Sequence, residues 1–353
     1  MSANKTVAVF GAYGHTGRFL VAELLGRGFV PLLVGRAAGR LQELAARHPG
    51  LAYRVASADD PASLDRALAG AAAVVNSAGP FASTAGPVIE AALRNRVPYV
   101  DVAAEIEANV DTFTHFADRA KAAGVAVVPA MAFFGGLGDL LVTTAMGDWT
   151  AADEAHVAYG LSSWHPTAGT LVSGAVSRER RDGQRVRYTG GRLEYYVAEQ
   201  ALPTLDWDFP APMGTRSVLG EFTMADVVTV PSHLAIPEVR TYMTTDAARD
   251  LAAPDSPAPA AVDELGRSAQ LFTVDVVVRS GDTRRRVVAR GRDIYAVSAP
   301  LAVEAVHRIL AGQTRTTGVA SAGEIFDAPD FLRALSAHLA IELHDESSVP
   351  QFA

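Results

Sequence analysis

The sequence has 353 residues, of which 49% are hydrophobic and 20% are charged, and it contains no cysteine. This composition is that of an ordinary folded protein, and it excludes disulfides, thiolate metal sites and a cysteine nucleophile. The formal net charge of −8 argues against nucleic acid or an anionic membrane as the partner. Because no apolar run approaches the roughly 18 residues of a membrane span and no signal-peptide core follows Met1, we expect a cytoplasmic protein with a small-molecule substrate.

A glycine-rich turn follows the first predicted strand, Thr6–Phe10, and leads into a helix predicted over residues 15–27. Gly11 permits a sharp turn, Gly14 lets the backbone approach a pyrophosphate, and Gly17 lets the helix pack closely on the sheet. The helix amides and dipole would then face the phosphates. The spacing differs from the commonest NAD fingerprint, so a plain strand-to-helix turn is the alternative. We expect cofactor contacts from Gly11, Tyr13, Gly14, His15, Thr16 and Gly17.

Strand and helix patterns alternate through the first 130 residues, which is typical of βαβ units and a parallel sheet. The expected strands are short and nearly all apolar, as they are when helices cover both faces of a sheet. We therefore predict an α/β protein with a Rossmann domain over residues 1–130. Its strands are predicted at Thr6–Phe10, Val30–Val34, Ala52–Ala56, Ala72–Val75, Pro98–Val102 and Val125–Pro129.

The pattern changes after Ala130 and predicts a second, α+β domain over residues 131–299. Val274, Val276 and Val278 alternate as in a half-exposed antiparallel strand, which favours a mixed, largely antiparallel sheet. An exposed sheet makes a homodimer the expected assembly. Strands are predicted at His156–Gly160, Val186–Tyr188, Ser217–Phe222, Phe272–Val278 and Arg285–Arg290, and helices at Pro300–Leu310 and Ala328–Leu339.

The end of the second strand indicates which cofactor binds. NAD enzymes usually place a carboxylate there for the ribose 2′-hydroxyl, whereas this chain has Arg36, with Arg40 one helical turn further on. A guanidinium suits a 2′-phosphate by its charge and by its planar fork of donors. We therefore predict NADP, with a solvated surface arginine as the alternative interpretation.

Several motifs of the first domain occur together and in a fixed order. Asn76-Ser-Ala-Gly-Pro-Phe81 follows the fourth strand, and Tyr99-Val-Asp101 is followed by Glu105. With the glycine spacing and Gly35-Arg36, they resemble the NADP-binding domain of the saccharopine dehydrogenase family, which also contains trans-acting enoyl reductases. The resemblance implies NADP binding, hydride transfer, and a C-terminal part, residues 300–353, that packs back on the Rossmann domain.

The segment after the fourth strand lies at the switch point beside the first strand, where a ligand is expected to bind. We expect cofactor contacts there from Ser77, Ala78, Gly79, Pro80 and Phe81. Asp101 and Glu105 follow the next strand, and Ala104 stands where the family pattern has glycine. Either carboxylate could transfer a proton, although capping a helix or holding a loop is the favoured interpretation.

Residues after the first domain supply candidate substrate contacts, namely Phe133, Phe134, Trp164, Thr167 and Thr170. The two phenylalanines suit a floor under the nicotinamide and equally a domain hinge. The threonine hydroxyls and the amides of a helix that begins here can converge on an anionic or carbonyl oxygen. His165 and Tyr159 are the candidate acid/base residues, and protonation by water is the alternative.

Two common kinds of catalytic centre are missing from the sequence. The Tyr-x-x-x-Lys pair of short-chain dehydrogenases is absent, because neither Lys5 nor Lys121 has a tyrosine four residues before it. His-Glu-x-x-His spacing is also absent, so we predict no metal.

Three functions remain. The first is reduction by NADPH of a C=C or C=N bond in a carbonyl-containing metabolic or natural-product intermediate. The second is a saccharopine-type amino-acid dehydrogenase, which needs arginines to hold carboxylates. Arginines do crowd residues 178–187, but their pattern there is typical of an exposed hairpin. The third is a sensor that binds NADP without turning it over.

Overall fold

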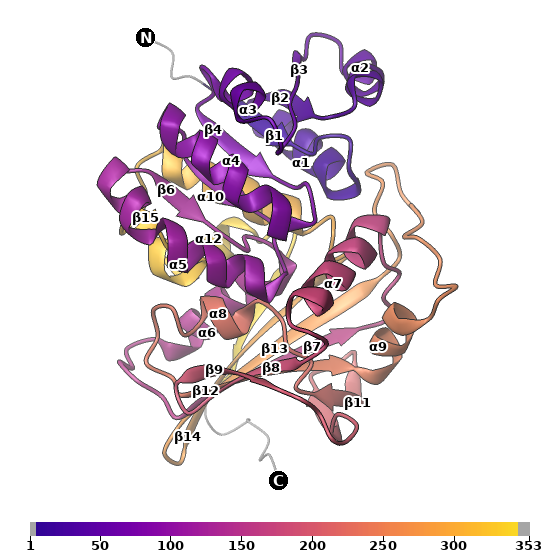
Figure 1. Ribbon diagram of the computed structural model, residues 1–353. Coiled ribbons are helices and arrows are strands. Elements are labelled where there is room, and N and C mark those ends of the chain that lie inside the picture. The colour runs from indigo at the N-terminus through magenta and orange to yellow at the C-terminus, as the bar shows by residue number, and fades with distance from the viewer. Residues whose placement is uncertain (1–4, 345–353) are drawn as a thin grey trace.

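The computed structural model describes residues 5–344, which form two sheets with helices packed against them (Figure 1). The first sheet is parallel throughout and belongs to the N-terminal half, whereas the second is mixed and largely antiparallel. The fold class predicted from the sequence is confirmed. Among the described residues, no helix is long and apolar enough to cross a membrane.

The first sheet has the strand order β15-β6-β5-β4-β1-β2-β3. The chain leaves β1 to one side for β2 and later returns to its other side for β4, so a switch-point crevice opens at the carboxyl ends of these strands. The strands are β1 (Thr6–Phe10), β2 (Val30–Gly35), β3 (Tyr53–Val55), β4 (Ala73–Asn76), β5 (Tyr99–Asp101), β6 (Ala126–Val128) and β15 (Gly318–Val319).

Helices cover both faces of the first sheet. α1 and α10 pack side by side on one face, and α3, α4 and α5 lie together on the other. Local signals set their ends: the Asp60 side chain accepts from the Ser63 amide at the start of α3, and Gly124, with a φ of 65°, ends α5. The helices are α1 (His15–Gly26), α2 (Ala38–Arg47), α3 (Pro61–Leu68), α4 (Phe81–Asn95), α5 (Ile106–Ala123) and α10 (Ser298–Leu310).

The second sheet has the order β10-β11-β12-β7-β13-β14-β16, and the β8–β9 hairpin is attached to β12. The half-exposed strand expected around Val274 is instead buried on both faces, because Val274 packs into the main core and Val277 packs against Trp207. The strands are β7 (Glu154–Leu161), β8 (Arg185–Thr189), β9 (Arg192–Tyr196), β10 (Thr204–Phe209), β11 (Gly214–Gly220), β12 (Glu238–Thr244), β13 (Leu271–Ser280), β14 (Thr283–Arg292) and β16 (Ala340–His344).

The arginine-rich stretch is not the hairpin that we expected at residues 178–187. α7 (Ala168–Arg180) continues through Arg178, and the hairpin turn comes later, between β8 and β9. The helix continues because its last turns are held by α5: Ser177 and Arg181 donate hydrogen bonds to the buried Glu107 carboxylate.

The C-terminal part serves both sheets. α10 packs beside α1 and β15 extends the first sheet, whereas β16 pairs with β14 in the second. Residues 345–353 of the range 300–353 lie outside the described residues. The remaining helical segments are η1 (Phe133–Leu137), α6 (Gly138–Met146), α8 (Asp226–Thr229), α9 (Thr245–Ala252), α11 (Ala322–Ile325) and α12 (Ala328–Ala334).

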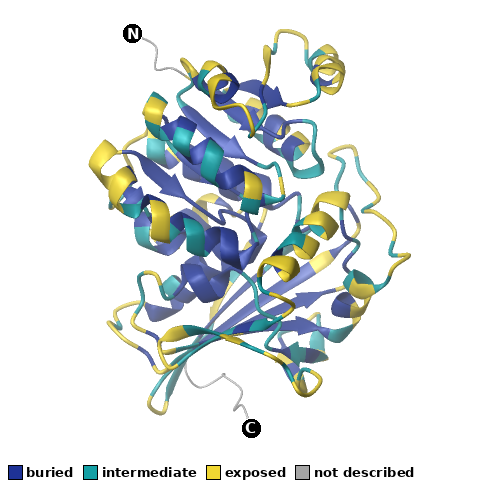
Figure 2. Cartoon of the chain, in the orientation of Figure 1, coloured by how far each residue is buried: buried dark blue, intermediate teal, exposed yellow. Residues whose placement is uncertain are grey.

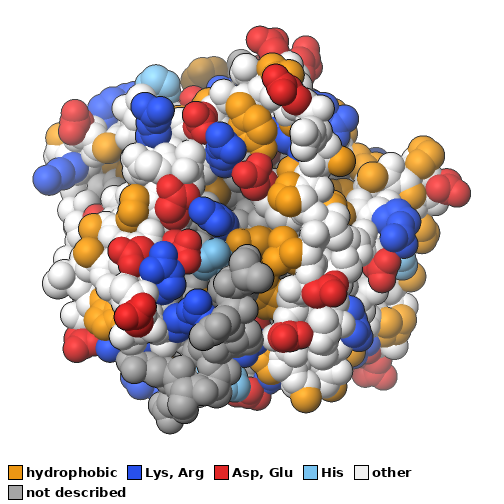
Figure 3. Space-filling model, turned by 90° about the horizontal axis from the view of Figure 1, so that it is seen from below, with side chains coloured by type: hydrophobic (Ala, Val, Ile, Leu, Met, Phe, Trp, Pro, Cys, Tyr) orange, Lys and Arg blue, Asp and Glu red, His pale blue; other side chains and the backbone are white. Residues whose placement is uncertain are grey.

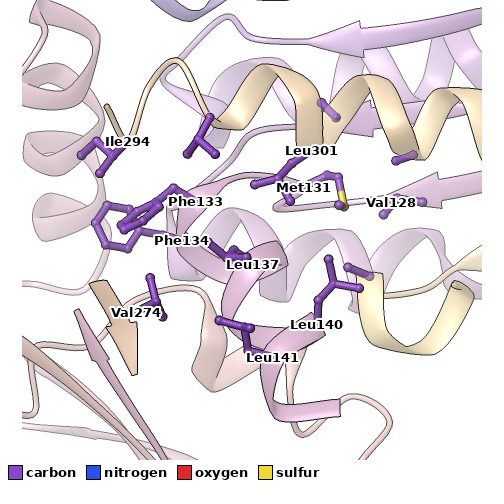
Figure 4. Close-up of a cluster of buried hydrophobic side chains, with 14 of the residues drawn as sticks. Val128, Met131, Phe133, Phe134, Leu137, Leu140, Leu141, Val274, Ile294 and Leu301 are labelled. Atoms are coloured by element: carbon purple, nitrogen blue, oxygen red, sulfur yellow. The ribbon is translucent and has the colours of Figure 1, made fainter. Parts of the chain in front are cut away.

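One hydrophobic core runs from the first sheet into the second. Figure 4 shows Val128 of β6 and Leu301 of α10 on one side of η1, with Leu141 of α6 and Val274 of β13 on the other. Burial is continuous between the two sheets, and exposed residues lie on the outer helices and loops (Figure 2). On the face seen in Figure 3, acidic and basic side chains are interspersed. The two halves are therefore joined by a packed junction.

Candidate functional site

The turn after β1 has the close approaches that its glycines were predicted to allow. Gly11 has a φ of 91°, and a Cβ there would lie 2.9 Å from the amide nitrogen of Ala78. A Cβ on Gly17 would overlap the carbonyl oxygen of Gly11. The turn is closed by a 2.9 Å hydrogen bond from the Gly14 amide to the Gly11 carbonyl. Side chains are therefore excluded from the point where the turn meets the loop after β4.

The N-terminus of α1 is open to an anion. No described side chain caps this end, and its first turn carries no acidic residue. His15 lies at the first helical position, and its Nε2 is buried without a hydrogen-bond partner among the described residues. Burial lowers the pKa of His15, so its imidazole is neutral at physiological pH. Uncapped amides and a neutral ring can both donate to a phosphate.

Two arginines stand beyond the end of β2. Arg36 and Arg40 are exposed, and neither forms an ion pair with a described residue. The ring of Tyr13 lies on Gly35, where a Cβ would come within 2.7 Å of it. The guanidinium carbon of Arg40 is 5.7 Å from the centroid of that ring. Arg40 thus lies over the aromatic ring next to the turn, and Arg36 directly follows the glycine that this ring contacts.

Hydrogen bonds with buried polar side chains fix the loop after β4, residues 77–81. Asn76 accepts from the Ala78 amide and donates to the hydroxyl of Tyr99, which donates to Asp101. Burial raises the pKa of Asp101 to about 6, although two backbone amides oppose the shift. Glu105 accepts from the first two amides of α4, at 2.7 and 2.9 Å. Asp101 and Glu105 thus hold a loop and cap a helix.

α7 lies over this loop. A Cβ on Gly79 would come within 2.7 Å of the Ser173 hydroxyl, so the helix touches the loop where we expect the nicotinamide ribose. Thr167 caps the helix by accepting from the Thr170 amide at 3.1 Å. The Thr167 hydroxyl is thereby committed to the cap. α7 links the second domain to the crevice.

A tyrosine that sequence reasoning missed connects the predicted substrate residues. The hydroxyl of Tyr295 accepts from Trp164 Nε1 at 3.1 Å and from the Thr167 amide at 3.3 Å, and it lies 2.9 Å from the Thr170 hydroxyl. Its ring also meets the ring of His15 edge-on, with centroids 5.3 Å apart. Tyr295 therefore joins the phosphate-binding turn to the start of α7. In the sequence, Tyr295 is marked only by its place shortly before the helix predicted at Pro300–Leu310.

The structure places other predicted residues in the interior. Phe133 and Phe134 are 1% and 6% exposed and pack on Tyr159 and Trp164. They form the packed junction between the sheets. Tyr159 is fully buried, and its hydroxyl donates to Asp226 at 2.8 Å. We therefore leave Tyr159 out of the proposed chemistry, because its proton faces a carboxylate in the core.

His165 lines a cavity of about 250 Å³ between the start of α7 and residues 259–270. Its imidazole forms no hydrogen bond with another described side chain. Tyr295 lines the same cavity. Among the described residues, no cluster of three or more histidine, aspartate or glutamate side chains could hold a metal ion.

Comparison with known proteins gives a match for the N-terminal third of the chain. The family described as saccharopine dehydrogenase NADP binding domain matches residues 7–128. These residues are therefore similar to the NADP binding domain of saccharopine dehydrogenase. The family resemblance and the cofactor predicted from the sequence are confirmed.

One solved structure extends the likeness beyond the NADP binding domain. Apo saccharopine dehydrogenase (L-Glu forming) from Saccharomyces cerevisiae has a TM-score of 0.64 at 12% identity, covering 96% of this chain and 100% of that one. A short-chain dehydrogenase/reductase from Veillonella parvula matches with a TM-score of 0.27 at 23% identity, over 29% of this chain and 49% of that one. Vestitone reductase from alfalfa matches with a TM-score of 0.25 at 19% identity, over 29% and 38%. A search of curated proteins found no match.

The residues of the NADP binding domain fit the cofactor. The glycine turn leaves a cradle that a Cβ would fill, and the buried Nε2 of His15 lacks a partner among the described residues. The chain as a whole shares the fold of apo saccharopine dehydrogenase.

Proposed function

We propose that this protein is an NADPH-dependent reductase that transfers hydride to a C=C or C=N bond of a carbonyl-containing intermediate. The observation that carries the cofactor half of this proposal is the pair of exposed arginines, Arg36 and Arg40, which have no carboxylate partner among the described residues. A 2′-phosphate would supply the missing anion. The turn at Gly11 and the open end of α1 would hold the pyrophosphate.

The chemistry needs a hydride and a proton. NADPH supplies the hydride when it is bound. In our proposal, Thr170 and Tyr295 orient the acceptor at the start of α7, and the imidazole of His165 gives the proton to the atom next to the reduced carbon. Turnover that persisted after removal of His165 would indicate that water donates the proton. Loop residues 77–81 would lie along the nicotinamide ribose.

A saccharopine-type amino-acid dehydrogenase is less well supported. It would need arginines to hold the carboxylates of its substrate. In the arginine-rich stretch, Arg180 pairs with Asp111, Arg181 pairs with Glu107, and Arg187 pairs with Glu194. These three guanidiniums are already paired with side chains of the protein itself, which leaves Arg178 and Arg185 of this stretch without an ion pair among the described residues.

Turnover tests the proposal. Purified protein would be mixed with NADPH and a panel of enones, cyclic imines, and 2-oxo acids paired with amino acids, and loss of NADPH absorbance would be followed. We expect turnover with an enone or an imine. Turnover only with an oxo acid and an amino acid would support the dehydrogenase, and tight NADPH binding without any turnover would support the sensor. His165→Gln should lower the turnover number, and unchanged turnover would reject His165 as the acid.

A further inference from the structure

The cavity beside His165 has a wall that the sequence motifs did not predict. Residues 253–270 leave α9 and rise toward α1 as the orange segment at the right of Figure 1. The segment is closed on itself by the Val262 amide, which donates to the Arg267 carbonyl at 2.8 Å. Asp263 anchors it by accepting from Arg267 Nε at 2.8 Å. At its tip, Gly266 lies against the ring of Phe19 in α1. The wall therefore bridges the two domains.

No lysine, arginine, aspartate or glutamate lines this cavity. Its apolar surface comes from Pro259, Ala260, Val262 and Ala269, together with the ring of Tyr295. Two carboxylates that hold the cavity walls already have partners in the backbone: Asp293 accepts from the Ser268 amide at 2.6 Å, and Asp250 accepts from the Trp164 amide at 3.0 Å. A cationic ligand would therefore lose water here without gaining an opposite charge, and an anionic ligand would gain one only from the His165 imidazole when that ring is protonated.

Only a few polar groups of the lining are free to bind a ligand. Both polar atoms of the Gln270 side chain have a partner, because Nε2 donates to the Ser163 carbonyl and Oε1 accepts from the Ile294 amide. The hydroxyl of Ser162 accepts from the Leu271 amide. The hydroxyls of Ser163 and Ser268 and the imidazole of His165 have no side-chain partner among the described residues. The cavity thus offers two hydroxyls and one imidazole on an apolar wall.

The cavity adjoins the cofactor side of the molecule through Tyr295. This side chain lines the cavity, and its ring meets His15 at the phosphate-binding turn. The volume of about 250 Å³ is below the range of about 300–1,000 Å³ usual for drug-sized ligands. The cavity is therefore large enough for the reactive end of a substrate, and the rest of a larger substrate would lie outside it.

We propose that this cavity is the acceptor site and that it selects an uncharged, carbonyl-bearing compound of either free or carrier-linked origin. This inference rests on the proposed function and narrows it, because it excludes amino acids and dicarboxylic acids as acceptors. Ser163 and Ser268 bind the carbonyl oxygen, the imidazole of His165 faces the atom that takes the proton, and residues 259–262 contact the apolar remainder.

The absence of cysteine from the sequence permits a direct test. Ser163→Cys and Ala260→Cys each place one thiol in the cavity, on opposite walls. Leu265→Cys is the matched control, because Leu265 belongs to the same segment, is 68% exposed and does not line the cavity. Each variant is treated with methyl methanethiosulfonate and with its sulfonatoethyl and trimethylammonioethyl counterparts. The three reagents are neutral, negative and positive.

We expect the ratio of neutral to charged labelling rates to be at least about tenfold higher at positions 163 and 260 than at 265, for both signs of charge. Equal ratios at the three positions, or preferential entry of one charged reagent, would overturn the proposed selectivity. This arm does not depend on turnover.

A second arm asks whether the cavity is the acceptor site. Ser163→Cys labelled with the neutral reagent should lose turnover of a simple probe, cyclohex-2-enone, while its Kd for NADPH changes by less than about twofold. Retained turnover after labelling would refute the site and leave the reductase function standing. Absence of enone and imine turnover in the unmodified protein would instead refute the proposed function, and the labelling ratios would remain interpretable. Comparing cyclohex-2-enone with its thioester-linked analogue distinguishes free from carrier-linked acceptors.

Discussion

The two halves of the candidate site are built in different ways. The cofactor crevice is formed by backbone: Gly11 and Gly17 are six residues apart, and the space they leave depends on missing side chains. The cluster around Tyr295 is formed by side chains from distant segments, with Trp164 and Thr170 more than 120 positions away in the chain. The first half is fixed by local geometry and the second by tertiary packing. Substitutions should therefore affect them separately.

The largest effect is expected at Gly17. A Cβ there would overlap the Gly11 carbonyl oxygen, so Gly17→Ala must displace backbone. We predict a loss of about 3 kcal/mol in the free energy of unfolding and loss of NADPH binding, measured by urea denaturation and by titration. Gly26→Ala is the matched control in the same helix, because a Cβ there meets nothing within 4 Å. It should stabilise the protein by about 0.5–1 kcal/mol. Similar changes in stability and NADPH binding for Gly17→Ala and Gly26→Ala would contradict the claim that the turn has no room for a Cβ at position 17.

The next effect concerns the junction between the halves. Burial raises the pKa of Asp226 to about 7, so the folded state holds this proton more tightly than the unfolded state does. The free energy of unfolding of the wild type should therefore fall as the pH rises from about 4 to about 7. Asp226→Asn has no proton to lose at this position, so its free energy of unfolding should not fall for this reason. We predict that the free energy of unfolding of the variant rises relative to that of the wild type over that range, measured by urea denaturation. Parallel pH profiles would show that the carboxyl is ionised throughout.

Tyr295→Phe should damage the second half and spare the first. The change leaves Trp164 Nε1 and the Thr167 amide without their shared acceptor, at a cost of about 1–2 kcal/mol. Turnover of the acceptor should fall, while the Kd for NADPH stays within about twofold. Tyr53→Phe, on the exposed strand β3, should change neither. If Tyr295→Phe weakened NADPH as strongly as it slowed turnover, the two halves would not be separable.

The smallest effect is expected from Glu105→Gln. The carboxylate accepts from the Phe81 and Ala82 amides, and its charge lies at the N-terminus of α4. The amide keeps one acceptor oxygen and removes the charge, so we expect a loss of about 1 kcal/mol by thermal or urea denaturation. Glu43→Gln, on the exposed face of α2, is the control. A loss no larger than that of the control would exclude the capping role.

Much of the first half could be predicted from the sequence. The strands at Thr6–Phe10 and Val30–Gly35 and the cap at Asp60 follow from local patterns of apolar, glycine and capping residues. The second half was less predictable. β9, β10 and β12 were missed, because pairing with distant strands decides their conformation.

The residues of the candidate site likewise differ in how far the sequence predicts them. Gly17 and Arg36 could be predicted as cofactor contacts because the spacing of the motifs alone singles them out. Tyr295 was missed, because only the folded chain brings its hydroxyl to the start of α7. Phe133 and Phe134 were expected in contact with substrate, whereas their aromatic surface is used up in packing on Tyr159 and Trp164. Apolar side chains of a core and of a pocket look alike in a sequence.

The central claim is that Arg36 and Arg40 bind the 2′-phosphate of NADPH. The most direct test is to measure the Kd values of NADPH and NADH for the wild type and for the double variant Arg36→Ala/Arg40→Ala. We predict that the wild type prefers NADPH, and that the double variant weakens NADPH by at least about tenfold while NADH changes by less than about twofold. Equal weakening of both nucleotides, or none, would contradict the assignment.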